Sequence, residues 1–488
     1  MVDEKSRNLN KERILSVILT LLYIAVHVFI AIHHEAWRDE GQSWMLVKNS
    51  TVSELLADLC VEGHPALWFF TIMPFIKLGL PFRLFSLISL ISMGLAFYCL
   101  VRFSPFPYWI RVLLSFSSLF MYYNPVIPRI YSEVALLVIV LSLLFPKRAE
   151  HPWLYGLLLL LLAQSHILLE GLTIGLVFEC FIRLFTKKKE RSKATIPFAM
   201  GTISGLTAIA ELFPRAGTNR SVDISASGIF SNFTMARFIL LRDATTYSLW
   251  GFSGRFPLLL LSVFLALGVI CLSFLAIRRY GFLSFLKWGS IVFISFGIPL
   301  FIVFFVYSIH NQMATILLLL LLGFLTMLWA TCDSKGLKYT ALIFVLALSL
   351  ATFPQAFSAA LYDINGPYSN SMATADYIVE NADEDSVILV AENEYNSPIY
   401  GYVSDSRPDI EFYSFQKYEP YKYHVWGVAY PQFTPAEIAS VAVNLFNGRS
   451  VYLLLPYGIE DDTWLEDLIL ANSENPAQEY YIVYNVNA

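Results

Sequence analysis

Charged residues are scarce in this sequence. Lys, Arg, Asp and Glu make up 15% of its 488 residues, whereas 57% of the residues are hydrophobic and the mean hydropathy is +0.59. Soluble domains contain about 25% charged residues, so the composition excludes an ordinary soluble protein and predicts a polytopic membrane protein. The apolar runs are long and do not alternate with polar residues, which excludes β-barrel strands and favours helices.

Cysteine is also rare, and a cleavable leader is missing. The five cysteines are scattered, none lies beyond Cys332, and none has the spacing of metal ligands. The sequence therefore predicts neither a disulfide framework nor a zinc site. The stretch "MVDEKSRNLNKER" leads directly into the first apolar run, without a cleavage signature. We expect that run to be retained as the first membrane span.

Basic residues are few in the last part of the chain. From Ala359 onward there are four Lys or Arg and twenty Asp or Glu, a balance that makes binding to nucleic acid or to an anionic membrane surface unfavourable. Strand and helix patterns alternate there and predict a small α/β domain. The predicted helices are 374–381, 434–448 and 462–471, and the predicted strands are "SVILVAE", "SVYLLLPYG" and "EYYIVYNV". We expect two domains, residues 1–358 and residues 359–488.

Apolar segments of the first domain have the length that a helix needs to cross about 30 Å of hydrocarbon. Eleven such spans are predicted, at 14–33, 84–101, 110–124, 131–146, 152–167, 168–186, 195–213, 256–277, 288–308, 313–331 and 339–358. The segment 65–80 is apolar too, but it contains Pro74 and Lys77 and, at about fifteen residues, is short for a crossing.

The distribution of Lys and Arg decides whether 65–80 spans. If it does not, 19 of the 33 Lys and Arg lie in cytoplasmic segments; if it does, the cluster "TKKKERSK" lies outside, against the positive-inside rule. We therefore predict a multi-pass protein of the plasma membrane with a cytoplasmic N-terminus and an extracytoplasmic acidic domain. Residues 34–83 then form a long first external loop, with 65–80 in the outer interface. Within this loop Thr51 and Glu54 have capping-box spacing and predict a short amphipathic helix on the membrane.

Polar residues that are unusual for a membrane protein collect at the outer ends of these spans. Ionisable groups at membrane depth are costly, and they usually line a cavity or pair with one another. Each residue alone is better explained by a solvated helix end, but their gathering on one side favours a shared site. The members of this set are Asp39, Glu40, Glu62, His64, Arg129, Tyr131, Glu133, His166, Glu170 and His310.

The chemistry of this set suits a lipid phosphate. The planar guanidinium of an arginine holds phosphate oxygens, and a carboxylate beside a hydroxyl can take its proton as a general base. An apolar groove formed by the amphipathic helix and 65–80 would hold a lipid tail. The residues thus predict transfer of a group from a lipid phosphate outside the cytoplasm.

Three stretches of the chain resemble the GT-C glycosyltransferases, in particular the branch of protein O-mannosyltransferases and lipid A aminoarabinose transferases. They are "WRDEGQSWMLV", "SELLADLCVEGHPALWFF" and "IPRIYSEVALLVIV". The first resembles the family's Asp-Glu pair after the first span, the second its His-Pro-Pro-like motif, and the third its Arg-x-Tyr stretch before a span. The resemblance covers about residues 14–190, and the chain departs from it at Ala66, where the family has a second proline.

The resemblance implies a polytopic GT-C fold and an inverting hexosyl or pentosyl transfer from a polyprenyl-phosphate sugar. Asp39 matches the family's catalytic carboxylate, and Glu40 matches the neighbouring acid, for which Arg129 is the candidate partner. His64 matches the motif near the donor phosphate. Other residues expected at the lipid phosphate are Tyr131, Glu62, His166 and His310.

Several points stay open at this stage. A cofactor is not required, but a divalent cation held by Asp39 and Glu40 is compatible with the residues. The acceptor is a glycan, a lipid or a protein, and no nucleic acid is expected. The alternative functions are a transporter or flippase and a polymerase or ligase of lipid-linked saccharides. The first of these predicts charged spans and repeated halves, whereas the spans here have interiors with almost no charge.

Overall fold

The computed structural model describes most of the chain. The described residues are 2–186, 190–213, 234, 255–302, 312–366, 368–393, 395–426, 428, 430–431, 433, 435–446, 449–456 and 481–485. The candidate residue His310, most of the loop 214–255 and the predicted helix 462–471 lie outside these ranges.

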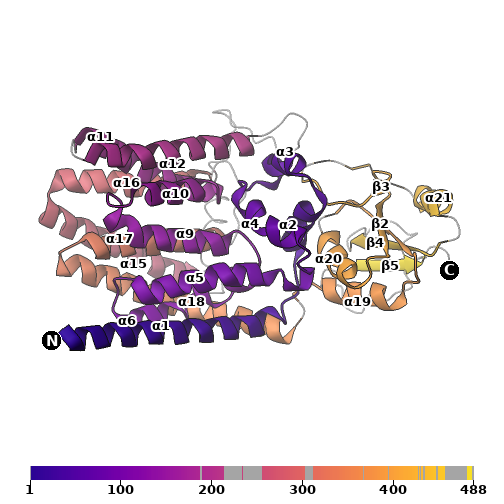
Figure 1. The fold of residues 1–488 in the computed structure, drawn as a ribbon, viewed down its shortest axis with the longest axis horizontal. Helices are drawn as coiled ribbons and strands as arrows, with labels where there is room; N and C mark the ends of the chain where they lie inside the picture. Colours follow the sequence, from indigo (N-terminus) through magenta and orange to yellow (C-terminus); the bar gives the residue numbers. More distant parts are fainter. Residues whose placement is uncertain are drawn as a thin grey trace.

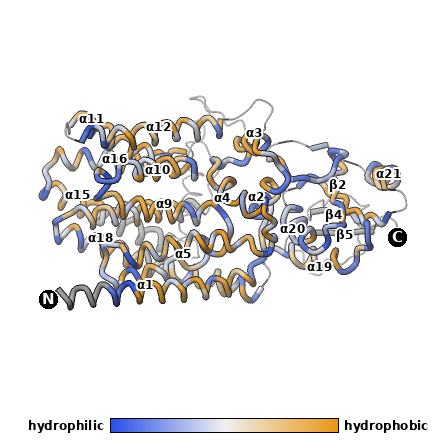
Figure 2. Tube along the Cα trace, viewed as in Figure 1, coloured by the Kyte–Doolittle hydropathy of each residue, from blue (hydrophilic) through white to orange (hydrophobic). Residues whose placement is uncertain are grey.

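Long helices lie side by side and form the N-terminal part of the molecule (Figure 1). Hydrophobic residues cover most of their length (Figure 2). The long helices are α1 (Val2–Ala31), α5 (Ser86–Phe103), α9 (Tyr131–Leu144), α10 (Pro152–Ala163), α11 (Glu170–Thr186), α12 (Arg191–Leu212), α15 (Arg255–Tyr280), α16 (Phe282–Phe301), α17 (Gln312–Thr331) and α18 (Lys335–Asn365). Short 3-10 turns η1 (Phe82–Leu84), η2 (Phe145–Lys147) and η3 (Ile167–Leu169) precede or join some of them.

Several of these helices are fit to cross a membrane. Within the described ranges, four are long and apolar enough by length and composition: Asn10–Ala31, Phe82–Phe103, Arg191–Leu212 and Phe282–Phe301. Large apolar side chains on them face outward, such as Leu21, Ile91 and Phe293, which are 61%, 55% and 77% exposed. An apolar outer surface of this kind suits contact with lipid. The prediction of an α-helical polytopic membrane fold is confirmed.

Most of the predicted spans coincide with helices. In place of the predicted span 152–167, α10 has 12 residues and is about 18 Å long, too short to cross the hydrocarbon core by the length criterion that excludes α4. Residues 110–124 were expected to form one helix, and this is wrong: α6 (Tyr108–Leu114) ends early, and the short helices α7 (Ser118–Met121) and α8 (Tyr123–Val126) follow. The hydroxyls of Ser115 and Ser117 donate to the carbonyls of the preceding turn, at 2.6 Å each. Such local bonds compete with a regular helix.

Three short helices lie between the long helices and the C-terminal part (Figure 1). They are α2 (Arg38–Asn49), α3 (Val52–Glu62) and α4 (Leu67–Lys77). The predicted capping box is confirmed: Thr51 Oγ1 accepts from Glu54 N at 3.2 Å, and Glu54 Oε2 accepts from Thr51 N at 2.7 Å. Helix α4 has 11 residues and is therefore about 16 Å long, too short to cross the hydrocarbon core.

A five-stranded sheet with helices forms the C-terminal part. Its strand order is β3-β2-β1-β4-β5, in which β1 is parallel to β2 and β4 while β3 and β5 pair antiparallel at the edges. The predicted α/β domain is thus present, and α18 runs on to Asn365, past the boundary expected at 358. The elements are α19 (Ser371–Asn381), β1 (Val387–Val390), α20 (Asn396–Ser406), β2 (Glu411–Ser414), β3 (Glu419–Pro420), α21 (Pro435–Phe446), β4 (Val451–Pro456) and β5 (Tyr481–Asn485).

The C-terminal part packs directly on α2 and η1. The ring of Phe82 lies between Trp44 and Tyr402, at centroid distances of 5.1 and 4.9 Å. A Cβ placed on Gly41 would lie 2.3 Å from Pro398 N, and one on Gly401 would lie 2.5 Å from Phe82 Cδ1. Glycine at both positions therefore permits α2, η1 and α20 to approach at backbone distance.

Candidate active site

The candidate site lies where the long helices meet α2 and the C-terminal part. Its first residue, Asp39, is in the first turn of α2. Its second, Arg129, comes just before α9 and is 90 positions away in the sequence. Arg129 Nη1 donates to Asp39 Oδ2 in a hydrogen-bonded ion pair. The two side chains are only 20% and 12% exposed, so the pair is sheltered but still reachable.

Two histidines extend this ion pair. Arg129 Nη2 lies 3.4 Å from His64 Nε2, and the ring of His64 lies 5.0 Å from that of His166. Tyr131 lies near both His166 and Arg129. The centre of its ring is 5.7 Å from the centre of the His166 ring and 5.6 Å from the guanidinium carbon of Arg129. These five residues come from four segments of the chain, and the fold brings all of them together.

The positive charge of Arg129 is well secured. Burial acts to lower the pKa of Arg129, but Asp39 and Tyr131 act in the opposite direction, and the net effect raises the pKa above its usual value. The guanidinium is therefore charged at any pH at which the protein is folded. A fixed cation beside two imidazoles is suited to an anionic group such as a phosphate.

Glu40 points to a different set of partners. Its carboxylate lies 3.1 Å from His34 Nε2, and His34 Nδ1 lies 2.9 Å from Asp363 Oδ2. Burial acts to lower the pKa of His34, but the two carboxylates outweigh it and raise the pKa to about 10. The sequence predicts that Glu40 orients Arg129. The structure instead pairs Arg129 with Asp39 and pairs Glu40 with the ring of His34.

The other predicted site residues in the described ranges are Glu62, Glu133 and Glu170. Glu62, the last residue of α3, accepts a hydrogen bond from Gln42 Nε2 at 2.9 Å and so joins α3 to α2. Glu133 and Glu170 are buried in the first turns of α9 and α11, at 6% and 5% exposure.

Arg38 adds an element that sequence reasoning missed. Its guanidinium lies 4.8, 5.2 and 5.9 Å from the ring centres of Trp37, Tyr395 and Trp426. Arg38 Nη1 also donates to Tyr395 Oη at 3.1 Å, and Arg38 Nε lies 3.4 Å from Asp39 Oδ1. Two of these rings belong to the C-terminal part, so no signal near "WRDE" could have indicated them.

Metal ligation finds little support in this geometry. Within the described ranges no group of three or more His, Cys, Asp and Glu side chains is arranged to hold a metal ion. Asp39 and Glu40, the two acids considered for a cation, turn to separate partners, Arg129 and His34. Neither acid is therefore set to share an ion with the other in this conformation.

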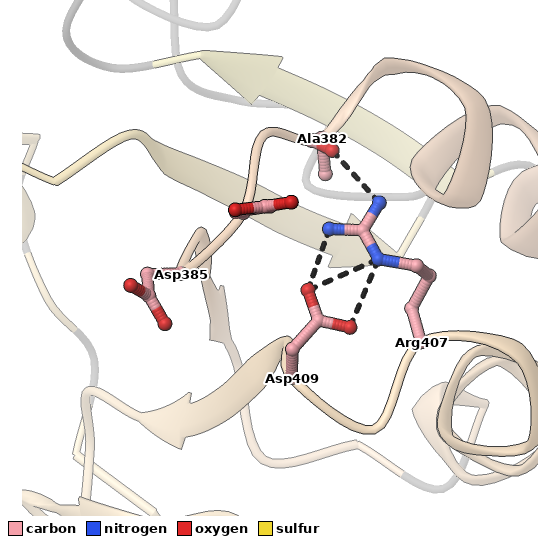
Figure 3. A pocket seen from close by; sticks show the side chains of 5 residues that line it. Ala382, Asp385, Arg407 and Asp409 are labelled. Atoms are coloured by element: carbon pink, nitrogen blue, oxygen red, sulfur yellow. Dashed lines mark hydrogen bonds and ion pairs between the residues drawn. The ribbon is translucent and has the colours of Figure 1, made fainter.

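A polar pocket of about 520 Å³ lies elsewhere, in the C-terminal part (Figure 3). It is lined by Ala382, Glu384, Asp385, Arg407 and Asp409. These residues precede β1 and β2 and so lie at the amino ends of the parallel strands, whereas α/β sheets bind ligands at the carboxyl ends. Arg407 is occupied by Asp409 and by the carbonyl of Ala382, at 2.6 and 3.0 Å. We interpret this arrangement as structural.

Comparisons with known proteins give a distant likeness. No family model and no curated protein sequence matches the chain. Among solved structures, the chain is similar to ArnT from Cupriavidus metallidurans bound to undecaprenyl phosphate, with 14% identity and a TM-score of 0.40, covering 97% of this chain and 98% of that one. It is also similar to the apo state of the same protein, with 11% identity, a TM-score of 0.40 and 97% coverage of both chains. At these values the likeness transfers neither residue roles nor an activity.

Proposed function

We propose that the protein is an inverting glycosyltransferase that moves a sugar from a polyprenyl-phosphate carrier to an acceptor hydroxyl at the extracytoplasmic face of the membrane. The observation that carries the proposal is the contact of Asp39 with Arg129 and, through it, with His64. A carboxylate can serve as the base of such a transfer, and a fixed cation stabilises the charge on the departing phosphate; the imidazole of His64 lies beside that cation. These three residues belong to the same part of the molecule as helices that are long and apolar enough to cross a membrane.

The proposed reaction is a single displacement. The acceptor oxygen forms a bond to the anomeric carbon while the bond from that carbon to the phosphate oxygen breaks. Asp39 takes the proton of the acceptor hydroxyl, and the polyprenyl phosphate leaves with the bonding electrons. Arg129 and His64 stabilise the charge on the phosphate. Since phosphate is already a good leaving group, positioning and cationic stabilisation supply most of the rate enhancement.

The resting ion pair has a consequence for this reaction. The Asp39 oxygen that accepts from Arg129 is occupied by that hydrogen bond and is not available to an acceptor hydroxyl. A donor phosphate would compete for the guanidinium of Arg129 and release Asp39 when the site is filled. The base would thus become active only with the donor bound, which would suppress its action in the empty enzyme.

The first test is the substitution Asp39→Asn, with membranes given labelled undecaprenyl-phosphate hexoses and pentoses. General-base catalysis contributes about 10²–10⁴-fold, so we expect transfer to fall by that factor while the folded protein persists. Asp376→Asn is the matched control, because it removes an exposed Asp–Arg pair, with Arg83 at 3.1 Å, away from the site. Undiminished transfer by a folded Asp39→Asn protein would exclude Asp39 as the base.

A further inference from the structure

The turn that leads into Asp39 is bound on several sides by residues of the C-terminal part. We call residues 34–40 the Asp39 turn. The backbone N–H of Ala36 donates to Tyr402 Oη at 2.8 Å. The carbonyl of Ala36 accepts from Ser369 Oγ and from Ser371 Oγ, each at 2.9 Å. Both backbone polar groups of Ala36, its N–H and its carbonyl, are thus satisfied by side chains more than 330 positions away in the sequence.

The neighbouring residue Glu35 makes the complementary contact. Its Oε2 accepts from the backbone N–H groups of Ser369 and Asn370, at 3.0 and 2.9 Å. Asn370 has a φ of 57°, in the left-handed region that side chains other than glycine adopt at a cost. The carboxylate of Glu35 therefore helps to hold the bend that in turn presents Ser369 and Ser371 to Ala36.

The two ends of the turn are fixed as well. His34 bridges Asp363, near the end of α18, and Glu40, with all three side chains at most 1% exposed. Immediately after the turn, Gly41 lies against Pro398 so closely that no Cβ would fit. The contacts therefore run along the whole turn, from His34 to the residue that follows Glu40.

We propose that residues 363–402 act as a positioning element, which holds the backbone of the Asp39 turn so that Asp39 stays at the site and faces the acceptor hydroxyl once a donor phosphate has taken the guanidinium of Arg129. This inference rests on the proposed function, since it assigns the C-terminal part to the geometry of the reaction. Fixing the conformation of a residue costs conformational entropy, which contacts from outside the turn must offset. Misplacement of a catalytic group by about 1 Å can cost about 10²-fold in rate. Residues 32–37 have no helix of their own and depend on outside partners for order.

The test removes single contacts without touching the site. Tyr402→Phe deletes only the hydroxyl that binds Ala36 N–H, and Tyr452→Phe is the matched control. Tyr452 is another buried tyrosine of the C-terminal part, and its hydroxyl donates to the carbonyl of Asn381 at 2.9 Å. Amide hydrogen exchange of peptides covering residues 34–40 and the kinetics of transfer from the undecaprenyl-phosphate sugar that the wild type uses are measured for both.

We expect Tyr402→Phe to speed exchange of the turn by about 5-fold, which is the equivalent of losing one buried hydrogen bond of about 1 kcal/mol. We expect kcat to fall by about 10-fold while KM for the donor changes by less than about 2-fold, because Arg129 and His64 remain. Tyr452→Phe should alter neither quantity. A structural role alone would lower the amount of folded protein without this split between kcat and KM.

A second variant, Gly41→Ala, tests the same proposal in case Tyr402→Phe has only a small effect. Gly41→Ala forces α2 away from Pro398, whereas Gly289→Ala adds the same methyl group in α16, where nothing lies closer than 4.0 Å. Only Gly41→Ala should speed exchange of the turn and lower kcat. Faster exchange with unchanged kcat in both Tyr402→Phe and Gly41→Ala would overturn the positioning role and leave the proposed function standing. Full activity of Asp39→Asn would instead overturn the proposed function.

Discussion

Ion pairs lie at both ends of the long helices, and they differ in how they are completed. At the end near the C-terminal part, Arg129 divides its guanidinium between Asp39 and His64. At the other end, Arg148 follows η2 and meets Glu179 of α11 with two contacts, at 2.9 and 3.4 Å, and also donates to the carbonyl of Phe145 at 2.7 Å. The first arginine is shared with an imidazole, whereas the second is satisfied by a carboxylate and a carbonyl.

This difference distinguishes the candidate active site, which contains the Asp39–Arg129 pair, from the Arg148–Glu179 pair, which is structural. The Arg148–Glu179 pair joins the end of η2 to α11, with α10 between them in the sequence. Arg183 of α11 and Glu190, which directly precedes α12, form another ion pair at 2.7 Å. The Asp39–Arg129 pair instead has His64 beside it and lies where the long helices meet the C-terminal part. Charge at a helix end is therefore no guide to function until its partners are known.

The largest effect should come from making the same substitution at both ends. Arg129→Lys replaces a planar fork by a point charge at the proposed phosphate site, and loss of such a donor lowers kcat by about 10²–10³-fold. Arg148→Lys should leave kcat within about 2-fold when it is normalised to folded protein. The assay is sugar transfer in detergent or vesicles. Similar losses from both variants would remove the distinction between the two ends.

A smaller effect, on stability and its pH dependence, is expected for His34→Gln. Because the pKa of His34 is raised from 6.5 to about 10 by its carboxylates, the stabilisation is complete below about pH 6.5 and is lost as the pH rises toward 10. Removing one partner of a buried ionic group costs about 3 kcal/mol. The Tm of the wild type should therefore fall between pH 6.5 and 10 more than that of the variant. Parallel Tm profiles would show that His34 is neutral in the folded protein.

The smallest effect is expected for Glu179→Gln at the far end. The amide keeps a hydrogen bond to Arg148 but loses the charge, and Arg148 is still 17% exposed, so the loss is about 1–2 kcal/mol. Denaturation in detergent measures it, and transfer per folded molecule should be unchanged. A fall in kcat without a loss of stability would mean that the Arg148–Glu179 pair is coupled to the candidate active site.

The helical architecture could be predicted from the sequence because length and apolar composition are local properties. The capping box of Thr51 and Glu54 is equally local and is present as expected. The break after Leu114 was missed because apolar residues on both sides hide the hydrogen bonds of Ser115 and Ser117. In the C-terminal part, β2 and β3 were missed because strands of four and two residues give little periodicity. The eleven-span topology with a cytoplasmic N-terminus remains a prediction.

The candidate site could be predicted in part, because carboxylates, histidines and an arginine at helix ends stand out against apolar surroundings. The partners could not be predicted. Two adjacent acids, Asp39 and Glu40, look equivalent in the sequence, yet their side chains turn to Arg129 and to His34. The contribution of Tyr395 and Trp426 beside Arg38 depends on how the C-terminal part docks. No spacing in the chain encodes that contact.

The contact of Gly41 with Pro398 also restricts how this chain can change over time. Alanine is the better helix former, by about 1 kcal/mol, so drift should favour it at position 41 if helix α2 stood alone. The backbone of Pro398 forbids it. Any descendant with a side chain at 41 must also have shifted the start of α20. Position 41 and the start of α20 are therefore expected to change together, and a C-terminal half from a relative with a side chain at position 41 need not keep the close approach of Pro398 that this chain has.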